Sequence, residues 1–237
     1  VLDRRQGPTS NQAVVGFEQA SSALREVISE SAATASVPLP LASGWIGLAG
    51  SDRPEDREAF TRSLGDLVDD LRVTNDAELV LSGTPDGAGI ALIAGTGSIA
   101  FARTPDGRTG RSGGWGHIFG DEGSAYGVAV DGLRAVAAAT DGRGPATVLT
   151  ETLTNAWHAE TPQQLIRRVY APGVNKADIA ATAPLVLDAA EAGDAVAAGI
   201  VEQAGIDLAS LVMSLARRIP FATPPPVGWS SPAINRR

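Results

Sequence analysis

The chain is organised around residues 91–126, ALIAGTGSIAFARTPDGRTGRSGGWGHIFGDEGSAY. Two apolar runs, Ala91–Ala94 and Ile99–Arg103, flank a short glycine-rich segment, and Thr104–Gly107 has the composition of a turn. This arrangement predicts two strands joined by a tight hairpin. Glycine at this density costs backbone entropy on folding, and it usually marks places where the main chain approaches a ligand or takes a positive φ angle.

The hairpin itself has the composition of an anion site. Its free backbone N–H groups and two hydroxyls would share one concavity, which is what a phosphate group needs. The alternative is an ordinary β-turn, which a lone GTGS sequence favours. The four residues are Gly95, Thr96, Gly97 and Ser98.

Two further glycine-rich segments follow the hairpin and favour the anion site over an ordinary β-turn. Gly113-Gly114-Trp115-Gly116 and Gly120-Asp121-Glu122-Gly123-Ser124 precede an alanine-rich helical pattern at 128–139. A carboxylate held between glycines just before a helix is either an N-cap or a ligand of hydroxyl groups, and in isolation the cap is favoured. The order of the segments along the chain is therefore the specific signal.

Composition places the chain among α/β proteins. Hydrophobic residues make up 43% of it and aromatic residues only 5%, which is typical of closely packed, alanine-rich helices. A length of 237 residues allows one large domain or two small ones. The net charge of −8 disfavours nucleic acid and anionic membranes as partners. We therefore expect a small or neutral substrate, with no nucleic acid and no membrane as partner.

Cysteine and histidine usage limits the metal chemistry. The chain has no cysteine, so disulfides, thiolate metal sites and cysteine nucleophiles are excluded. Two histidines, His117 and His158, leave little scope for a nitrogen-ligated metal, and we predict no metal-ligating residue. No uninterrupted apolar run approaches about 18 residues, so neither a signal peptide nor a membrane span is predicted. A cytoplasmic location is the default expectation.

The N-terminal part alternates helical and extended patterns. The turn at 7–11 opens a helix, and the apolar run 41–49 predicts a buried strand that ends in a glycine-rich loop. The acidic segment after Pro54 predicts a helix whose apolar stripe continues to the next strand, at 71–74. A strand, a crossover and a strand favour parallel pairing. Asp76 follows the second strand, at the end where open α/β sheets place their ligands.

The C-terminal part is predicted to be helical and then irregular. A long helix begins at Asp194, its expected N-cap, and ends near Ile219. Three consecutive prolines follow, and they cannot continue the interior of a sheet. We therefore expect an incomplete α/β domain at 1–90, a second α/β domain at 91–219 and an irregular tail at 220–237. Short helices are expected at 146–157, 162–170, 175–182 and 185–192.

The order of these motifs resembles that of the BadF/BadG/BcrA/BcrD-type ATPase family. Within it, the chain is most similar to the N-acetylglucosamine kinases of the actin-like, sugar-kinase and Hsp70 superfamily. The resemblance implies an α/β fold of the actin-like ATPase (ribonuclease H-like) type. The lack of cysteine excludes the iron–sulfur members of the family, whose cluster needs thiolate ligands. The motifs that carry the resemblance are Gly7-Pro8-Thr9-Ser10-Asn11, Asn75-Asp76-Ala77, Gly95-Thr96-Gly97-Ser98, Gly113-Gly114-Trp115-Gly116, Gly120-Asp121-Glu122-Gly123-Ser124 and Asp141-Gly142-Arg143-Gly144-Pro145.

The resemblance also implies a reaction, which is ATP-dependent phosphorylation of an amino sugar with Mg²⁺. Phosphoryl transfer to a sugar hydroxyl needs a group that takes the hydroxyl proton, and the resemblance gives this role to Asp76. It assigns the hairpin 95–98 to the phosphates of ATP. The residues that it assigns to the sugar are Asn11, Gly114, Trp115, Gly116 and Asp121.

Each of these roles has a structural alternative. Asn11 would otherwise be a turn or capping residue, and Asp76 would belong to the cap of the short helix after it. Trp115 would pack as a core aromatic. His117 is expected either to be structural or to donate a hydrogen bond to a residue that binds the sugar. Glu122 is expected to support its loop.

Two elements that the resemblance leads us to expect are missing from the sequence. No Asp-Gly-Gly-Gly-Thr loop, which would carry the Mg²⁺-linked carboxylate, precedes Asn11. No Gly-Gly adenosine-binding turn follows the long helix. We therefore expect a fragment that is truncated at both ends and turns over poorly, because catalysis of this kind depends on neutralising phosphate charge.

Three functions stay open at this point. The first is an N-acetylglucosamine 6-kinase or a fragment of one, with glucosamine or N-acetylmuramic acid as alternative substrates. The second is an amino-sugar-binding protein or sensor without catalysis. The third is a degenerate gene product without a stable fold. Oligomeric state is not fixed by the sequence, and a homodimer is left open.

Overall fold

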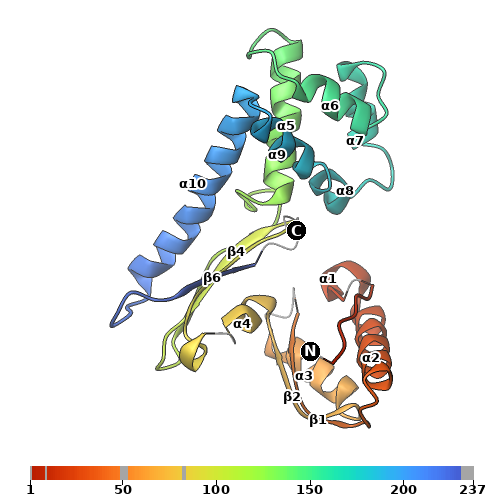
Figure 1. Ribbon diagram of the computed structural model, residues 1–237, viewed down its shortest axis with the longest axis vertical. Coiled ribbons are helices and arrows are strands. Elements are labelled where there is room, and N and C mark those ends of the chain that lie inside the picture. Colours follow the sequence, from red (N-terminus) through yellow and green to blue (C-terminus); the bar gives the residue numbers. More distant parts are fainter. Residues whose placement is uncertain (1, 9, 49–52, 82–83, 231–237) are drawn as a thin grey trace. The chain divides into compact units, whose positions relative to one another are not determined.

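The computed structural model describes residues 2–8, 10–48, 53–81 and 84–230 (Figure 1). The chain divides into two compact units, residues 1–83 and 84–237. The division falls before the boundary expected at residue 90, because strand β3 already pairs with β4 from Gly89 onward. Each unit has its own sheet and its own core.

The first unit is a pair of parallel strands covered by helices. Strands β1 and β2 run parallel, with Leu41 beside Val68 and Gly47 beside Thr74, as predicted. Phe60 is fully buried in the core of this unit, and its ring lies 4.9 Å from that of Phe17. The elements are α1 (Gln12–Val15), α2 (Phe17–Thr34), β1 (Leu41–Gly47), α3 (Pro54–Leu64), β2 (Val68–Thr74) and α4 (Asp76–Val80).

The boundary between α3 and β2 differs from the prediction. The helix was expected to continue toward residue 71, but α3 ends at Leu64 and β2 begins at Val68. Gly65 ends the helix, and the N–H of Leu67 bonds to the carbonyl of Leu64 at 2.9 Å in the turn that follows. The loop predicted after β1 includes residues 49–52, which lie outside the described part of the chain.

The second unit contains a four-stranded sheet in the order β5-β4-β3-β6. Strands β3 and β4 form the predicted antiparallel hairpin, with Ala94 opposite Ser98. Strand β5 adds to β4 through the predicted turn, in which the N–H of Gly107 bonds to the carbonyl of Thr104 at 2.9 Å. The bounds are Gly89–Ala94 for β3, Ser98–Arg103 for β4, Thr109–Gly113 for β5 and Val227–Ser230 for β6, and a short 3-10 turn, η2 (Pro85–Gly87), precedes β3.

Strand β6 corrects the expectation of an irregular tail over 220–237. Residues 227–230 pair in parallel with β3, while residues 231–237 lie outside the described chain. The prolines lack an N–H group but keep their carbonyls, and Pro226 accepts from the N–H of Ile90 at 2.9 Å. The proline run therefore ends immediately before the strand and leads into it, at the edge of the described sheet.

The helices of the second unit gather at one end of the sheet, and α10 runs back along it (Figure 1). The N-terminal half of α10 packs on α5 and α9 through Ala197, and its C-terminal half packs on the sheet through Leu211 and Leu215. All the helices predicted in this region are present. They are α5 (Ala125–Thr140), α6 (Leu149–Ala156), η3 (Pro162–Gln164), α7 (Leu165–Val169), α8 (Lys176–Ala180), α9 (Ala183–Glu191) and α10 (Ala195–Arg218).

Helix α10 is also, among the described residues, the one helix long and apolar enough to cross a membrane by length and composition. The sequence criterion of an unbroken apolar run missed this helix, because Glu202 and Asp207 interrupt the run. The mean hydropathy of the window is still 1.5. Only 6% of its apolar window is buried inside the structure, and its buried residues are Ala197, Leu211 and Leu215. The cytoplasmic location stays a prediction.

Candidate functional site

The hairpin between β3 and β4 is closed tightly at its base and open at its tip. The N–H of Gly95 bonds to the carbonyl of Gly97 at 2.9 Å, and Ser98 is buried. The carbonyl of Gly95 accepts from the N–H of Ala125, the first residue of α5, at 2.9 Å. Within the described chain, the N–H groups of Thr96 and Gly97 have no protein acceptor. The tip therefore presents two backbone donors, as an anion site requires.

Asp121 ties this hairpin to the glycine-rich loop at 120–124. Its Oδ1 accepts from the backbone N–H of Ser98 at 3.1 Å, and its Oδ2 accepts from Nζ of Lys176. A second bond, 2.7 Å long, runs from the hydroxyl of Ser98 to the carbonyl of Glu122. Asp121 is 4% exposed and has a φ of 64°, a left-handed conformation that aspartate adopts more readily than most residues. Two of the predicted motifs are thus brought together.

The N-cap alternative for Asp121 is wrong, because Ser124 occupies that position. Its hydroxyl accepts from the N–H of Gly127 at 3.1 Å and so begins α5. Asp121 instead faces the hairpin. A Cβ atom on Gly97 would lie only 2.6 Å from Oδ1 of Asp121, so this close approach of hairpin and loop needs a glycine.

Lys176 was not found by sequence reasoning. It is the first residue of α8, after the N-cap Asn175, and reaches Asp121 across 55 residues of sequence. Its ammonium also lies 5.8 Å from the centre of the Tyr126 ring. No local pattern links the two residues, although one signal was present: Lys176 is the single lysine among 19 basic residues.

The loop at 113–119 lies beside the hairpin and exposes aromatic surface. The N–H of Gly114 bonds to the carbonyl of Ser98 at 2.9 Å, which fixes the start of the loop on β4. Trp115 is 58% exposed, so the alternative that it packs in the core is wrong. The guanidinium of Arg111 lies 5.0 Å from the centre of its ring. An exposed, supported indole of this kind can pack against a sugar ring, and that role stays a prediction.

Asn11 and Asp76 belong to the first unit. Asn75 is the N-cap of α4 and accepts from the N–H of Glu78 at 2.7 Å, so Asp76 is not the N-cap residue. Asp76 follows the C-terminal end of β2, as expected, and its Oδ1 accepts from the N–H of Ala77 at 3.0 Å. Asn11 precedes α1, and its carbonyl accepts from the N–H of Val15 at 3.1 Å. Their approach to Asp121 stays a prediction, because that residue lies in the other unit.

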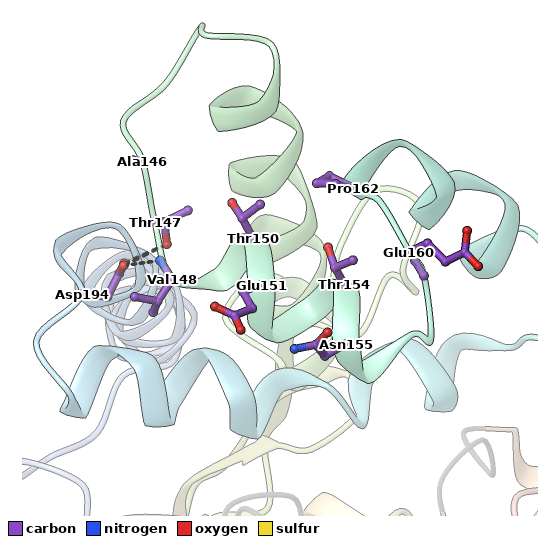
Figure 2. Close-up of a pocket in the computed structure, with 11 residues that line it drawn as sticks. Ala146, Thr147, Val148, Thr150, Glu151, Thr154, Asn155, Glu160, Pro162 and Asp194 are labelled. Carbon is purple, nitrogen blue, oxygen red and sulfur yellow. Dashed lines mark hydrogen bonds between the residues drawn. The ribbon is translucent and has the colours of Figure 1, made fainter.

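A cavity of about 570 Å³ lies beside α6 and the start of α10, and its described lining contains none of the predicted site residues (Figure 2). Asp194 in this lining accepts from the hydroxyl of Thr147 at 3.0 Å and from the N–H groups of Val148 and Ala197 at 2.9 Å. Desolvation acts to raise the pKa of Asp194, but these bonds together hold the pKa below its ordinary value. This carboxylate holds two helices together, as the predicted N-cap of α10.

A second cavity, of about 920 Å³, lies among α5, α7 and α8 and adjoins the hairpin site. His117, Tyr126 and Lys176 are among the residues that line it. The rings of His117 and Tyr126 meet edge to face at 5.2 Å. The ammonium that pairs with Asp121 is therefore shared between the hairpin site and this cavity.

The described residues fit a phosphate better than a metal. Among them, no three histidine, aspartate or glutamate side chains gather closely enough to hold an ion. Mg²⁺ in phosphoryl transfer is usually held by phosphates and one or two carboxylates. Asp121, the carboxylate beside the hairpin, is already paired with Lys176. We therefore assign no residue to Mg²⁺, whereas the open hairpin tip and the nearby ammonium suit the phosphates of ATP.

Comparison with known proteins gives a family match over most of the chain. The model of the BadF/BadG/BcrA/BcrD ATPase family matches residues 1–228. The N-acetylmuramic acid/N-acetylglucosamine kinase of Clostridium acetobutylicum is 40% identical over 167 residues, which are 69% of this chain and 54% of that protein. The N-acetyl-D-glucosamine kinase of Dictyostelium discoideum is 32% identical over 233 residues, covering 92% of this chain and 73% of that protein. The chain thus spans about half the length of the first relative and about three quarters of the second.

Solved structures confirm the predicted fold class. A candidate N-acetylglucosamine kinase from Chromobacterium violaceum superposes with a TM-score of 0.79 at 27% identity, covering 96% of this chain and 78% of that one. A second candidate, from Porphyromonas gingivalis, superposes with a TM-score of 0.60 at 22% identity, covering 86% and 70%. At 22% identity, the similarity to the second structure is evidence for the fold alone. The architecture is that of the actin-like ATPases.

Proposed function

Because the chain belongs to the BadF/BadG/BcrA/BcrD ATPase family, we propose that it phosphorylates an amino sugar with ATP, converting N-acetylglucosamine to its 6-phosphate. The observation that carries this proposal is the contact between the GTGS hairpin and Asp121. It supports the proposal because the hairpin that would bind the phosphates and the loop that would hold the sugar are hydrogen-bonded to each other. The names of the two relatives give the class of substrate.

In the proposed reaction, ATP supplies the phosphoryl group and the chain positions it. The free N–H groups at the hairpin tip hold phosphate oxygens. Asp76 takes the proton of the sugar 6-hydroxyl as that oxygen attacks the terminal phosphorus, and ADP is the leaving group. Asn11 accepts or donates at the other hydroxyls, and the exposed ring of Trp115 packs on the sugar.

Asp121 has a more restricted role than the one first assigned to it. Its side chain is only 5% exposed, and both oxygens already accept a hydrogen bond. Each carboxylate oxygen can accept one further hydrogen bond, and only this remaining acceptor position is open to a sugar hydroxyl. We propose that Asp121 chiefly fixes the distance between the phosphate hairpin and the sugar loop.

The identity of the sugar is the finer part of the proposal. N-acetylglucosamine appears in the names of both relatives, and N-acetylmuramic acid appears in one. Glucosamine is the third candidate. No described contact identifies the residues that would judge the substituents at positions 2 and 3 of the sugar, so we rank N-acetylglucosamine first on the relatives alone.

The test is release of ADP in a coupled assay with each of the three sugars. We expect ADP release that depends on N-acetylglucosamine. A thermal shift with sugar alone accompanies it, because ligand binding to the native state must raise stability by mass action. A shift without ADP release would instead identify a sugar-binding protein or sensor. ADP release at the same rate without any sugar would contradict the kinase proposal.

A further inference from the structure

The single lysine of this chain lies at the phosphate hairpin. Every other basic residue is an arginine, so lysine at position 176 is an exception within an arginine-rich composition. The two side chains differ physically. The planar guanidinium of arginine forms bidentate ion pairs with carboxylates, whereas the ammonium of lysine is a compact point charge with three N–H donors. A residue needed only to neutralise Asp121 would be served as well by arginine.

The position of Lys176 is fixed at both ends of its side chain. At the backbone, Asn175 and Asp178 form a capping box, in which the side chain of Asn175 accepts from the N–H of Ala177 at 2.8 Å and Asp178 accepts from that of Asn175 at 2.8 Å. At the tip, Nζ bonds to Oδ2 of Asp121. A Cβ atom on Gly97 would lie 3.0 Å from this nitrogen, so the ammonium touches the hairpin itself.

The ammonium retains donors for a ligand. It has three N–H groups, and Asp121 accepts one of them. The side chain of Lys176 is 29% exposed, whereas that of its partner is 5% exposed. The solvent-facing side of the pair is therefore cationic, and it lies beside the two free N–H groups at the hairpin tip.

We propose that Lys176 donates to a phosphate oxygen of the nucleotide held at the hairpin, with Asp121 as the residue that positions its ammonium. This rests on the proposed function and adds a phosphate ligand to it. The same ammonium also lines the 920 Å³ cavity. An anionic substituent of the sugar, such as the carboxylate of N-acetylmuramic acid, is a second source of the same chemistry, and the experiment separates the two sources.

The first measurement uses the single lysine directly. Biosynthetic incorporation of ¹³C,¹⁵N-labelled lysine labels Lys176 alone and leaves all three N–H groups of its ammonium intact. We expect the Lys176 signal to shift on titration with ATP and ADP, more weakly with AMP, and not with N-acetylglucosamine. A shift with N-acetylmuramic acid but not with ATP would overturn the assignment to phosphate. An unmoved signal in a protein that binds ATP by calorimetry would also overturn it.

The second measurement separates a ligand from a counter-ion. Lys176→Met should weaken ATP binding about tenfold to a hundredfold, the usual worth of a charged hydrogen bond. The double variant Asp121→Asn/Lys176→Met removes both charges but keeps an acceptor for the N–H of Ser98. We expect this variant to bind ATP as weakly as the single variant. Recovery of wild-type affinity would show that Lys176 only neutralises Asp121, and would overturn the proposal.

Controls keep this inference distinct from the proposed function. Arg62→Met removes an exposed cation that pairs with Glu58 and lines neither cavity, and it should leave ATP affinity unchanged. Lys176→Arg keeps the charge and should recover part of the affinity. A wild-type chain that binds no ATP contradicts both proposals, whereas wild-type binding that Lys176→Met leaves unchanged overturns the lysine assignment alone.

Discussion

Gly97 is the residue whose replacement should most directly disturb the hairpin. In Gly97→Ala the new methyl group would meet Oδ1 of Asp121 at 2.6 Å, so the hairpin and the loop would have to separate. We expect a loss of stability of about 1–3 kcal/mol, the usual cost of overpacking, together with weaker ATP binding. Thermal unfolding and calorimetry measure the two effects.

Gly199→Ala is the matched control for this change. Gly199 lies inside α10, and beyond the backbone of its own helix turn a Cβ atom there would meet nothing within 4 Å. Alanine at such a site should leave stability unchanged or raise it by about 0.4–1 kcal/mol. A Gly97→Ala protein as stable as Gly199→Ala, with wild-type affinity for ATP, would contradict the close packing of Asp121 on the hairpin.

Asp76 carries the catalytic part of the account. Asp76→Asn keeps the shape and an acceptor for the N–H of Ala77 but cannot take a proton at neutral pH. ADP release with N-acetylglucosamine should fall to background while the thermal shift with sugar remains. Asp70→Asn, at an exposed position of β2, the strand that precedes Asp76, should release ADP at the wild-type rate. Ordinary turnover by Asp76→Asn would exclude the general-base role.

At the scale of elements, Asp194 predicts how stability depends on pH. Its folded pKa lies below the ordinary value, so its contribution is fully present above the unfolded pKa of about 3.9 and is lost as pH falls through the folded pKa. Wild type should exceed Asp194→Asn in melting temperature at pH 7, and the difference should close below about pH 4. Asp131→Asn, on the exposed face of α5, serves as the control. A difference that does not change between neutral and acid pH would contradict the account.

Elements were predictable from the sequence where one periodicity was present. The β3–β4 hairpin has two apolar runs and a glycine turn between them, and it forms as expected. The α3–β2 junction was ambiguous, because Leu64, Leu67 and Leu71 fit the spacing of a helix while the last two lie outside α3. Strand β6 was missed because three prolines signal a break, although the strand begins directly after them.

At the scale of the whole molecule, local motifs were enough to predict the family and fold class, and long-range pairs were not. The GTGS and GDEGS motifs each consist of consecutive residues, so each could be recognised in the sequence by itself. The ion pair between Lys176 and Asp121 joins the loop before α5 to the first residue of α8, 55 residues apart in the sequence. No periodicity in the sequence predicts which cationic side chain pairs with a buried carboxylate. Its recognition needed coordinates.

A crystal structure of the chain with N-acetylglucosamine and ADP tests the central claim most directly. The account predicts one sugar whose 6-hydroxyl lies within hydrogen-bond reach of Asp76 and whose ring contacts Trp115, with the ADP phosphates at residues 95–98. Sugar bound away from Asp76, or phosphates bound away from the hairpin, would contradict it.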